Sequence, residues 1–379
     1  MSDERMTGPV AERTEDPARP LAGATQPTNQ TPPEEEVAPG GFVNKVIRNQ
    51  QAQILMILVI IVAIFGLLQP AEFLTPFNAR GIAINTAIYA VLGVGMTMVI
   101  ITAGIDLSAG SVLVCSAVVS SLAMRALGGE GWGVAFVGLV AAVLTGLLWG
   151  LLNGFLIAKA KVPTFIVTLG TFQAALGVAQ VLTGGIDLRV APTVLVDTIG
   201  FGNLFGQLPN LVVVSAIVVA LGAILLHRTR FGLYTYAVGS NPEAARRAGI
   251  KVDRHLISVY ALHGALCGFA GLLNLAFYQS TTLGGQSLTS MNVISGVALG
   301  GTSMFGGFGT ILGTVIGLFI PTTLQNGFVI LGIQPFWQLI VVGAVLVAAV
   351  YVDQRRRAAA TRSVRKTRAR KALLKGKVS

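Results

Sequence analysis

The sequence predicts an all-α, polytopic membrane protein with about ten transmembrane helices. Three observations indicate this class: 53% of the 379 residues are apolar, only 11% are charged, and the mean hydropathy is +0.73. A water-soluble chain of this length would be charged at about a quarter of its positions. The composition therefore excludes a soluble globular protein.

The charged residues divide the chain into three predicted parts. Residues 1–50 hold seven of the fifteen prolines and eight acidic groups, which predicts a disordered cytoplasmic extension. Residues 51–354 form the predicted transmembrane domain. Residues 355–379 carry eleven basic groups and no acidic group, so they supply the net charge of +11. This basic cytoplasmic tail favours anionic lipid headgroups over nucleic acid as its partner.

Ten apolar runs lie near the length that crosses about 30 Å of hydrocarbon at 1.5 Å per residue. The shortest, at 290–303, is rich in glycine. We still expect it to cross, because otherwise the basic tail would end outside the cell. The ten predicted runs are 52–69, 81–103, 109–127, 132–158, 164–183, 210–226, 255–277, 290–303, 310–330 and 335–352.

Lysine and arginine residues in the short loops predict the orientation. With the N-terminus in the cytoplasm, ten of them fall in inside loops and three in outside loops. Cytoplasmic loops of membrane proteins carry such an excess, so both termini are predicted to be cytoplasmic. The outer loops, including a long one at 184–209, are then the candidate docking surface for a soluble partner.

Glycines at four-residue spacing predict close contacts between helices. Gly146, Gly150 and Gly154 share one helix face, and Gly309, Gly313 and Gly317 share another. Small residues let two helix backbones approach closely in lipid, where no hydrophobic force drives helices together. We expect these faces to be helix contacts. Glycines that let helices slide during a transport cycle are the alternative.

The longest inside loop contains a short predicted helix at 241–249. Asn241 is a capping residue, Pro242 suits the first helical position, and Gly249 can close the helix. The charge of Glu243 is favourable at the positive end of the helix dipole. A helix this short is unstable in water by itself, so we expect it to dock on a partner. The alternative is that it lies on lipid headgroups.

Polar residues inside the apolar runs form a second candidate site. Asp106 is the acid expected at membrane depth, where a charge is costly. It follows Gly104, where a helix can end. Two roles of Asp106 are therefore possible, as the cap of a new helix or as a contact to the substrate. The neutral members can exchange hydrogen bonds with a hydroxyl-rich solute or bridge helices. The candidate path residues are Asn85, Asp106, Ser108, Asn153, Thr168, Thr171, Gln173, Asn274 and Asn326.

Three further features have an ordinary structural explanation. The pattern Thr-x-Gly-Ile-Asp-Leu occurs at 102–107 and again at 183–188, by chance or as a repeated device that breaks a helix. His255 and His263 are expected in the core rather than as ligands. The two cysteines, Cys115 and Cys267, are expected to act as small apolar residues. No catalytic or metal site is predicted.

Several motifs occur together in a fixed order along the chain. They are GIDLSAGS at 104–111, LNGFLIAK at 152–159, VPTFIVTLGT at 162–171, TRFG at 229–232, GGTS at 300–303 and GGFGT at 306–310. In this the chain resembles the permease subunits of bacterial ABC sugar importers of the ribose, xylose and galactose type. It departs from that pattern at 287–293, where the family usually has an acidic pair and this chain has no carboxylate.

The resemblance implies the fold of an ABC importer permease in the bacterial inner membrane, paired with a second copy or a paralogue. It implies a monosaccharide or polyol as cargo, delivered by a soluble or lipid-anchored binding protein. The short helix would be the coupling helix that contacts a cytoplasmic ATPase. Because no phosphate-binding loop occurs in this sequence, ATP and Mg²⁺ are expected on that partner. The implied coupling residues are Asn241, Pro242, Glu243, Ala244, Ala245, Arg246 and Gly249.

Three alternative functions stay open from the residues. The same machinery could carry branched-chain amino acids or nucleosides. An ion-coupled secondary transporter usually needs membrane carboxylates, and this chain offers essentially Asp106. A membrane-embedded enzyme would need a metal or nucleophile constellation, which the sequence does not contain.

Overall fold

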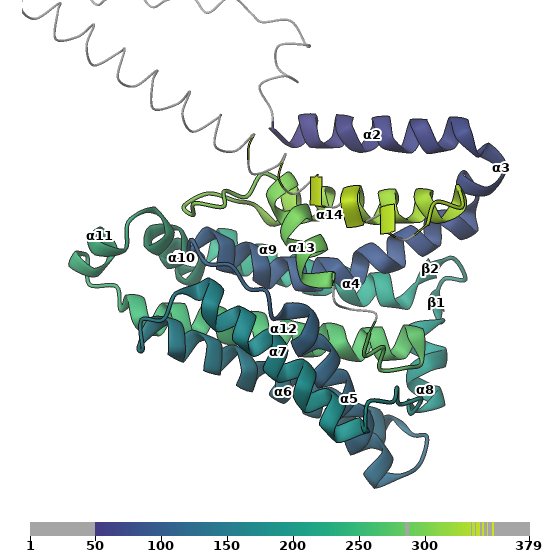
Figure 1. The fold of residues 1–379 in the computed structure, drawn as a ribbon, viewed down its shortest axis with the longest axis horizontal. Coiled ribbons are helices and arrows are strands. Elements are labelled where there is room, and N and C mark those ends of the chain that lie inside the picture. The colour runs from purple at the N-terminus through teal and green to yellow at the C-terminus, as the bar shows by residue number, and fades with distance from the viewer. Residues whose placement is uncertain are drawn as a thin grey trace, which may run out of the picture.

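Nearly all of the chain that the computed structural model describes is helical; it describes residues 50–284 and 288–334, with scattered residues of 336–351. Eight helices in this part are long and apolar enough to cross a membrane, which confirms the predicted all-α, polytopic class (Figure 1). They are α2 (Gln50–Leu68), α4 (Pro76–Ile101), α5 (Ala109–Leu127), α6 (Trp132–Ala158), α7 (Thr164–Thr183), α9 (Asn210–Arg228), α12 (Val252–Tyr278) and α14 (Ile311–Ile330).

The predicted helix bounds agree best where sequence signals lie at the helix ends. The runs at 109–127, 132–158 and 164–183 coincide with α5, α6 and α7. Helix α4 begins earlier than predicted because the Thr75 hydroxyl accepts a hydrogen bond from the Asn78 amide and so caps the helix. The run at 335–352 lies partly outside the described residues. The terminal parts 1–49 and 355–379 lie outside them altogether.

Short elements cover both ends of the bundle (Figure 1). At one end lie α3 (Pro70–Phe73), α8 (Thr193–Leu195), the π-helix Val196–Gly200, and a small hairpin of β1 (Asn203–Leu204) with β2 (Leu208–Pro209). We call this the hairpin end. At the opposite end lie α10 (Arg230–Ser240) and α11 (Pro242–Arg247), and we call it the α11 end.

The run predicted at 290–303 is not a transmembrane helix. Its helix, α13, spans Thr289–Leu299, and eleven residues reach only about 16 Å at 1.5 Å per residue. Helix α13 ends there because Gly301 takes a backbone φ of +87°, which breaks the helix. The following loop still reaches the α11 end, since the Gly307 amide donates a hydrogen bond to the carbonyl of Ile101, the last residue of α4.

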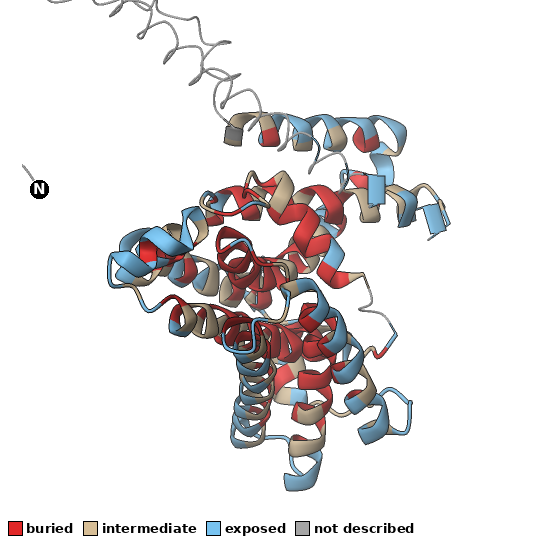
Figure 2. Ribbon diagram, turned by 60° about the vertical axis from the view of Figure 1, so that its left-hand side comes forward, coloured by how far each residue is buried: buried red, intermediate tan, exposed pale blue. Residues whose placement is uncertain are grey.

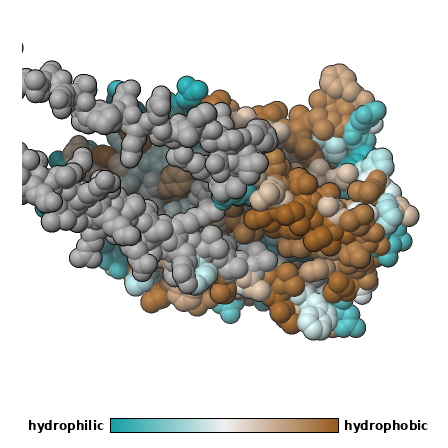
Figure 3. Space-filling model, turned by 90° about the horizontal axis from the view of Figure 1, so that it is seen from above, coloured by the Kyte–Doolittle hydropathy of each residue, from teal (hydrophilic) through white to brown (hydrophobic). Residues whose placement is uncertain are grey.

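Helix α4 lies at the centre of the bundle, where it contacts α9, α12, α13 and α14. In its most apolar stretch 89% of the residues are buried, whereas in α2, which packs mainly on α14, only 11% are. Figure 2 shows the buried residues gathered along the middle of the bundle. Figure 3 shows a broad hydrophobic outer face with hydrophilic residues toward its edges, as a lipid-facing surface requires.

The predicted glycine contacts are confirmed except at Gly309, which lies in the loop before α14 and so is not on a helix face. Helices α6 and α12 pack so closely that a Cβ atom on Gly264 would lie 2.2 Å from the Gly146 carbonyl oxygen. Gly150 packs against the same part of α12, around Gly264. Helices α13 and α14 meet in the same way, because a Cβ on Gly317 would lie 2.1 Å from the Gly296 carbonyl oxygen. Each pair therefore has backbone against backbone.

Candidate functional site

A tight turn between α4 and α5 holds the buried carboxylate of Asp106. The turn begins where Ala103 takes a backbone φ of +62° and ends α4. Asp106 Oδ1 accepts two hydrogen bonds from Ser108, one from its amide at 2.8 Å and one from its hydroxyl at 2.5 Å. The carboxylate thus stabilises its own turn, directly before α5 begins.

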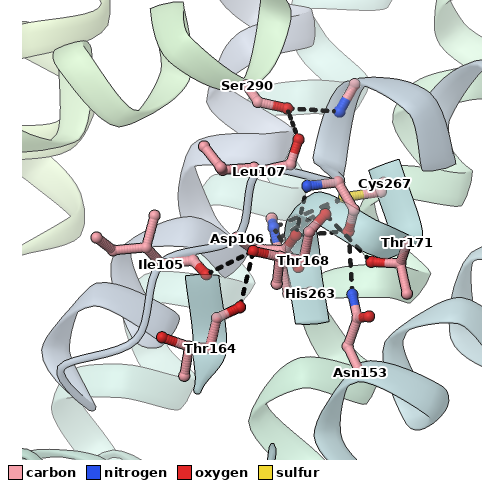
Figure 4. A network of polar contacts seen from close by, with 12 residues as sticks. Ile105, Asp106, Leu107, Asn153, Thr164, Thr168, Thr171, His263, Cys267 and Ser290 are labelled. Carbon is pink, nitrogen blue, oxygen red and sulfur yellow. Dashed lines mark hydrogen bonds and ion pairs between the residues drawn. The ribbon is translucent and has the colours of Figure 1, made fainter. Parts of the chain in front are cut away.

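Side chains from three other helices converge on this turn (Figure 4). From α6, Asn153 Nδ2 donates to the Ser108 hydroxyl at 3.0 Å. From α7, the Thr168 hydroxyl donates to the Ile105 carbonyl at 3.3 Å. From α12, His263 Nε2 lies 3.7 Å from Asp106 Oδ2. We call Asp106, Ser108, Asn153, Thr168 and His263 the Asp106 network.

Two polar atoms beside the network have no hydrogen-bond partner among the described residues. They are Asn153 Oδ1 and the hydroxyl oxygen of Tyr260, and both are fully buried. Tyr260 lies against Gly104, where a Cβ atom would come within 2.4 Å of its hydroxyl oxygen. Buried polar groups of native proteins are nearly always paired, so we expect an internal water molecule to bind these two atoms.

The other predicted path residues do not join the Asp106 network. The Thr171 hydroxyl bonds to carbonyls of its own helix, and Gln173 is exposed. The three remaining asparagines pair closer to the hairpin end: Asn85 accepts from the Tyr278 hydroxyl, Asn274 accepts from the Thr282 hydroxyl, and Asn326 donates to Asn78.

Two residues of this region were not among the predicted path residues. His263 is fully buried, as expected of a core residue, yet it faces Asp106. The Ser290 hydroxyl, at the start of α13, donates to the Leu107 carbonyl and accepts from the Gly110 amide. One feature of the sequence could have indicated the role of His263. The residue precedes Gly264, which places it near the tightly packed part of α12.

The second copy of Thr-x-Gly-Ile-Asp-Leu forms a similar turn. It follows the end of α7, and Gly184 takes a φ of +65°, close to the +62° of Ala103 at the corresponding position of the first copy. Asp187 corresponds to Asp106. Its Oδ1 atom accepts from the Thr281 hydroxyl at 3.0 Å and from the Leu283 amide at 2.6 Å. Both copies therefore end a helix and use a carboxylate oxygen to accept one hydroxyl and one amide.

The predicted short helix is present as α11 and has the predicted caps. The Asn241 side chain accepts a hydrogen bond from the Ala244 amide at 3.0 Å, and Pro242 occupies the first turn. Gly249 has a φ of +85° and closes the helix. Ala245 is buried against its neighbours, whereas Glu243 is exposed.

Ion pairs hold α11 to the bundle. Asp253, in the first turn of α12, accepts from Lys161 at 3.1 Å and from Arg246 at 3.3 Å, and it lies 3.6 Å from Lys159. Arg246 also lies 3.3 Å from Glu243. One carboxylate therefore joins α11, α12 and the loop between α6 and α7.

A direct contact links this end of the molecule to the Asp106 turn. Gly239, at the end of α10, packs so closely on α4 that a Cβ there would lie 1.7 Å from the Ile101 carbonyl oxygen. Ile101 is five residues before Asp106. The end of α10 therefore packs on the last residue of α4, directly before this turn.

Comparison with known proteins identifies the family. A family model described as "Branched-chain amino acid transport system / permease component" matches residues 78–350. The chain belongs to this permease family. Among the residues that the structure describes, this permease has no group of three His, Cys, Asp or Glu side chains that could hold a metal ion.

Individual relatives of the permease are named as sugar import permeases. The ribose import permease protein of Escherichia coli is 37% identical over 304 residues, covering 80% of this chain and 93% of that protein. The fructose import permease protein of Rhizobium meliloti is 34% identical, covering 79% and 84%. The D-allose transport system permease protein of E. coli is 35% identical, covering 79% and 90%. No solved structure matches the chain.

These findings confirm the family that the sequence motifs indicated. The relatives are transport permeases by name, in agreement with a predicted permease subunit rather than an enzyme. The roles of the individual candidate residues stay predictions.

Proposed function

We propose that the permease is the membrane-spanning subunit of an ATP-driven ABC importer for a monosaccharide or polyol. One observation carries the proposal: α11 presents an exposed Glu243 at one end of an apolar bundle, and caps and ion pairs hold it there. A six-residue helix that is capped and held by ion pairs is suited to dock on a partner, because so short a helix is unstable by itself in water. The names of the relatives support the cargo class.

The α11 end would face the cytoplasm and an ATPase that holds ATP and Mg²⁺. In support, the basic residues Lys159, Lys161, Arg246 and Arg247 lie at this end, as cytoplasmic surfaces require. Closure of two ATPase subunits would move α11 as a rigid body. The contact between Gly239 and Ile101 would pass that movement to the Asp106 turn.

The remaining partners follow from the same arrangement. A soluble or lipid-anchored sugar-binding protein would dock on the hairpin end. A second copy of the permease, or a paralogue, would complete the path across the bacterial inner membrane, with lipid around the pair. Both termini would then lie in the cytoplasm. Nucleic acid is not a partner in this scheme.

The alternatives receive less support. The family description names branched-chain amino acids, but the individual relatives described above are named for sugars. An ion-coupled transporter would need a carboxylate free to bind its ion. In Asp106, Oδ1 already accepts two hydrogen bonds from Ser108.

The test is ATP-driven uptake in proteoliposomes that contain the permease, its ATPase subunit and its binding protein. We expect Glu243→Arg to abolish uptake while the permease still assembles, because the substitution reverses the charge at the ATPase contact. Glu72→Arg makes the same change at the hairpin end, on α3, and controls for loss of folding. Uptake that persists without any ATPase subunit, or that Glu243→Arg leaves intact, would contradict the proposal.

A further inference from the structure

A polar cavity runs along α7 between the two copies of the repeated turn. It encloses about 360 Å³ and opens on one side. Pockets for small molecules range from about 300 to 1,000 Å³, so this one suits a small solute. Phe172, Leu176 and Gln180 line it at four-residue spacing, which places all three on one face of α7.

The cavity is lined by the start of α5, directly after the first turn, and by residues of the second turn. Gly110 and Ser111 belong to the start of α5, and Asp187 belongs to the second turn. The Ser111 hydroxyl donates to the Ser108 carbonyl, and Ser108 donates to Asp106. The cavity floor is therefore hydrogen-bonded directly to the Asp106 network.

The lining combines an apolar face with a few polar atoms. Phe172 and Leu176 supply the apolar face. Asp187 Oδ2 and the Gln180 amide receive no hydrogen bond from the described residues, so both are available to a ligand. A carboxylate oxygen accepts from hydroxyl groups, and an amide both donates and accepts. A sugar ring presents this combination of C–H faces and hydroxyl groups.

Charge narrows the class of ligand further. Asp187 is the one charged residue among the described residues that line the cavity. A negative carboxylate near the mouth repels an anionic solute such as a sugar phosphate. A neutral polyhydroxylated solute meets no such repulsion.

We propose that this cavity is a binding site for a neutral monosaccharide, in which Gln180 and Asp187 hold the hydroxyl groups and Phe172 contacts the ring. The site rests on the proposed function, because it would receive the cargo on its way through the permease. Gln180 and Asp187 would then contact the cargo, although neither is among the path residues predicted from the sequence.

Blocking the cavity tests the site in the complete transporter. Leu176→Trp would fill the cavity, whereas Val178→Trp places the same side chain on an exposed position of α7 that does not line it. ATP-driven uptake of labelled D-ribose is measured in proteoliposomes, then of D-fructose and D-allose. We expect Leu176→Trp to lower uptake by about tenfold or more and Val178→Trp to leave it unchanged.

A labelling experiment tests the site without relying on transport. Leu176→Cys places a thiol in the cavity and keeps Gln180 and Asp187, and Val178→Cys places one outside it; the native thiols of Cys115 and Cys267 are buried. Excess D-ribose, D-fructose or D-allose should slow the reaction of the Leu176→Cys thiol with a polar thiol reagent several-fold. Ribose 5-phosphate should not slow it, and no sugar should slow labelling of Val178→Cys.

The outcomes separate the two proposals. Uptake by the unmodified permease together with full uptake by Leu176→Trp overturns the cavity site and leaves the importer function standing. Should Leu176→Trp fail to fold, labelling of Leu176→Cys decides, and equal rates with and without all three sugars overturn the site. If the unmodified permease takes up none of these sugars and no other monosaccharide or polyol of a wider panel, the proposed function itself fails.

Discussion

Lys161 donates a hydrogen bond to Asp253 at 3.1 Å and so joins the loop between α6 and α7 to the first turn of α12. The same carboxylate lies 3.3 Å from Arg246 of α11. Three segments that are far apart in sequence thus meet at one side chain, which is a quarter exposed. Asp253 therefore attaches α11 to α12 through an ion pair.

Replacing Asp253 should therefore affect coupling more than stability. Exposed ion pairs contribute about 0–1 kcal/mol each, so Asp253→Asn should change the unfolding temperature of the purified permease only slightly. Because α11 loses its attachment, we expect ATP-driven uptake to fall several-fold. Asp253→Glu should restore most of it, and Asp197→Asn at the hairpin end should leave the unfolding temperature unchanged. A large loss of stability in Asp253→Asn would refute this account.

The close packing of α6 and α12 predicts a severe effect at Gly264. A leucine there would overlap the backbone at Gly146 and Gly150. Overpacking a well-packed contact costs about 1–3 kcal/mol or more, so we expect Gly264→Leu to reduce the yield of folded, monodisperse permease in detergent. Gly177→Leu, on α7, is the matched control, because a Cβ there meets no atom within 4 Å. Equal yields of the two variants would contradict the packing.

Two substitutions of Asp106 separate its hydrogen bonds from its charge. Asp106→Ala removes the acceptor of the Ser108 amide and of the Ser108 hydroxyl proton in the interior, at a cost of about 1–3 kcal/mol. Asp106→Asn keeps an oxygen acceptor, so it should be clearly more stable than Asp106→Ala in thermal unfolding. Normal stability together with complete loss of uptake in Asp106→Asn would instead favour an ion-binding role for the carboxylate.

The hydroxyl of Tyr236 on α10 donates to the Gly309 carbonyl at 2.6 Å. Burial raises the pKa of this phenol above its ordinary value of 10.0, so the donor stays protonated at neutral pH. Tyr236→Phe removes the hydrogen bond, and we expect a loss of about 1 kcal/mol in the free energy of unfolding together with reduced uptake. Tyr234→Phe, an exposed position on the same helix, should change neither. Identical behaviour of the two variants would count against this link between α10 and the loop after α13.

The sequence was sufficient to predict the fold class and most of the helix bounds. Apolar length and capping residues mark α5, α6 and α7, and Asn241 and Gly249 mark α11. The length of α13 was not predictable, because an apolar run does not reveal that Gly301 takes a left-handed backbone conformation.

The candidate site was predictable only in its local part. Asp106 and Ser108 are neighbours in sequence, so their turn could be inferred from it. The contact between His263 and Asp106 depends on which face of α12 packs against that turn. The pattern of polar residues in the sequence does not reveal which face this is. For the same reason Asn85, Asn274 and Asn326 look like path residues in the sequence, yet each is paired with another polar group near the hairpin end.

The glycine contacts have a mechanical consequence. Helices α6 and α12 touch backbone to backbone, and so do α13 and α14, so neither pair can be compressed or sheared without a clash. Each pair is therefore expected to move as a rigid unit. Helix α4 contacts α12 of one pair and both α13 and α14 of the other. We therefore expect a conformational change to move the two pairs relative to each other along α4.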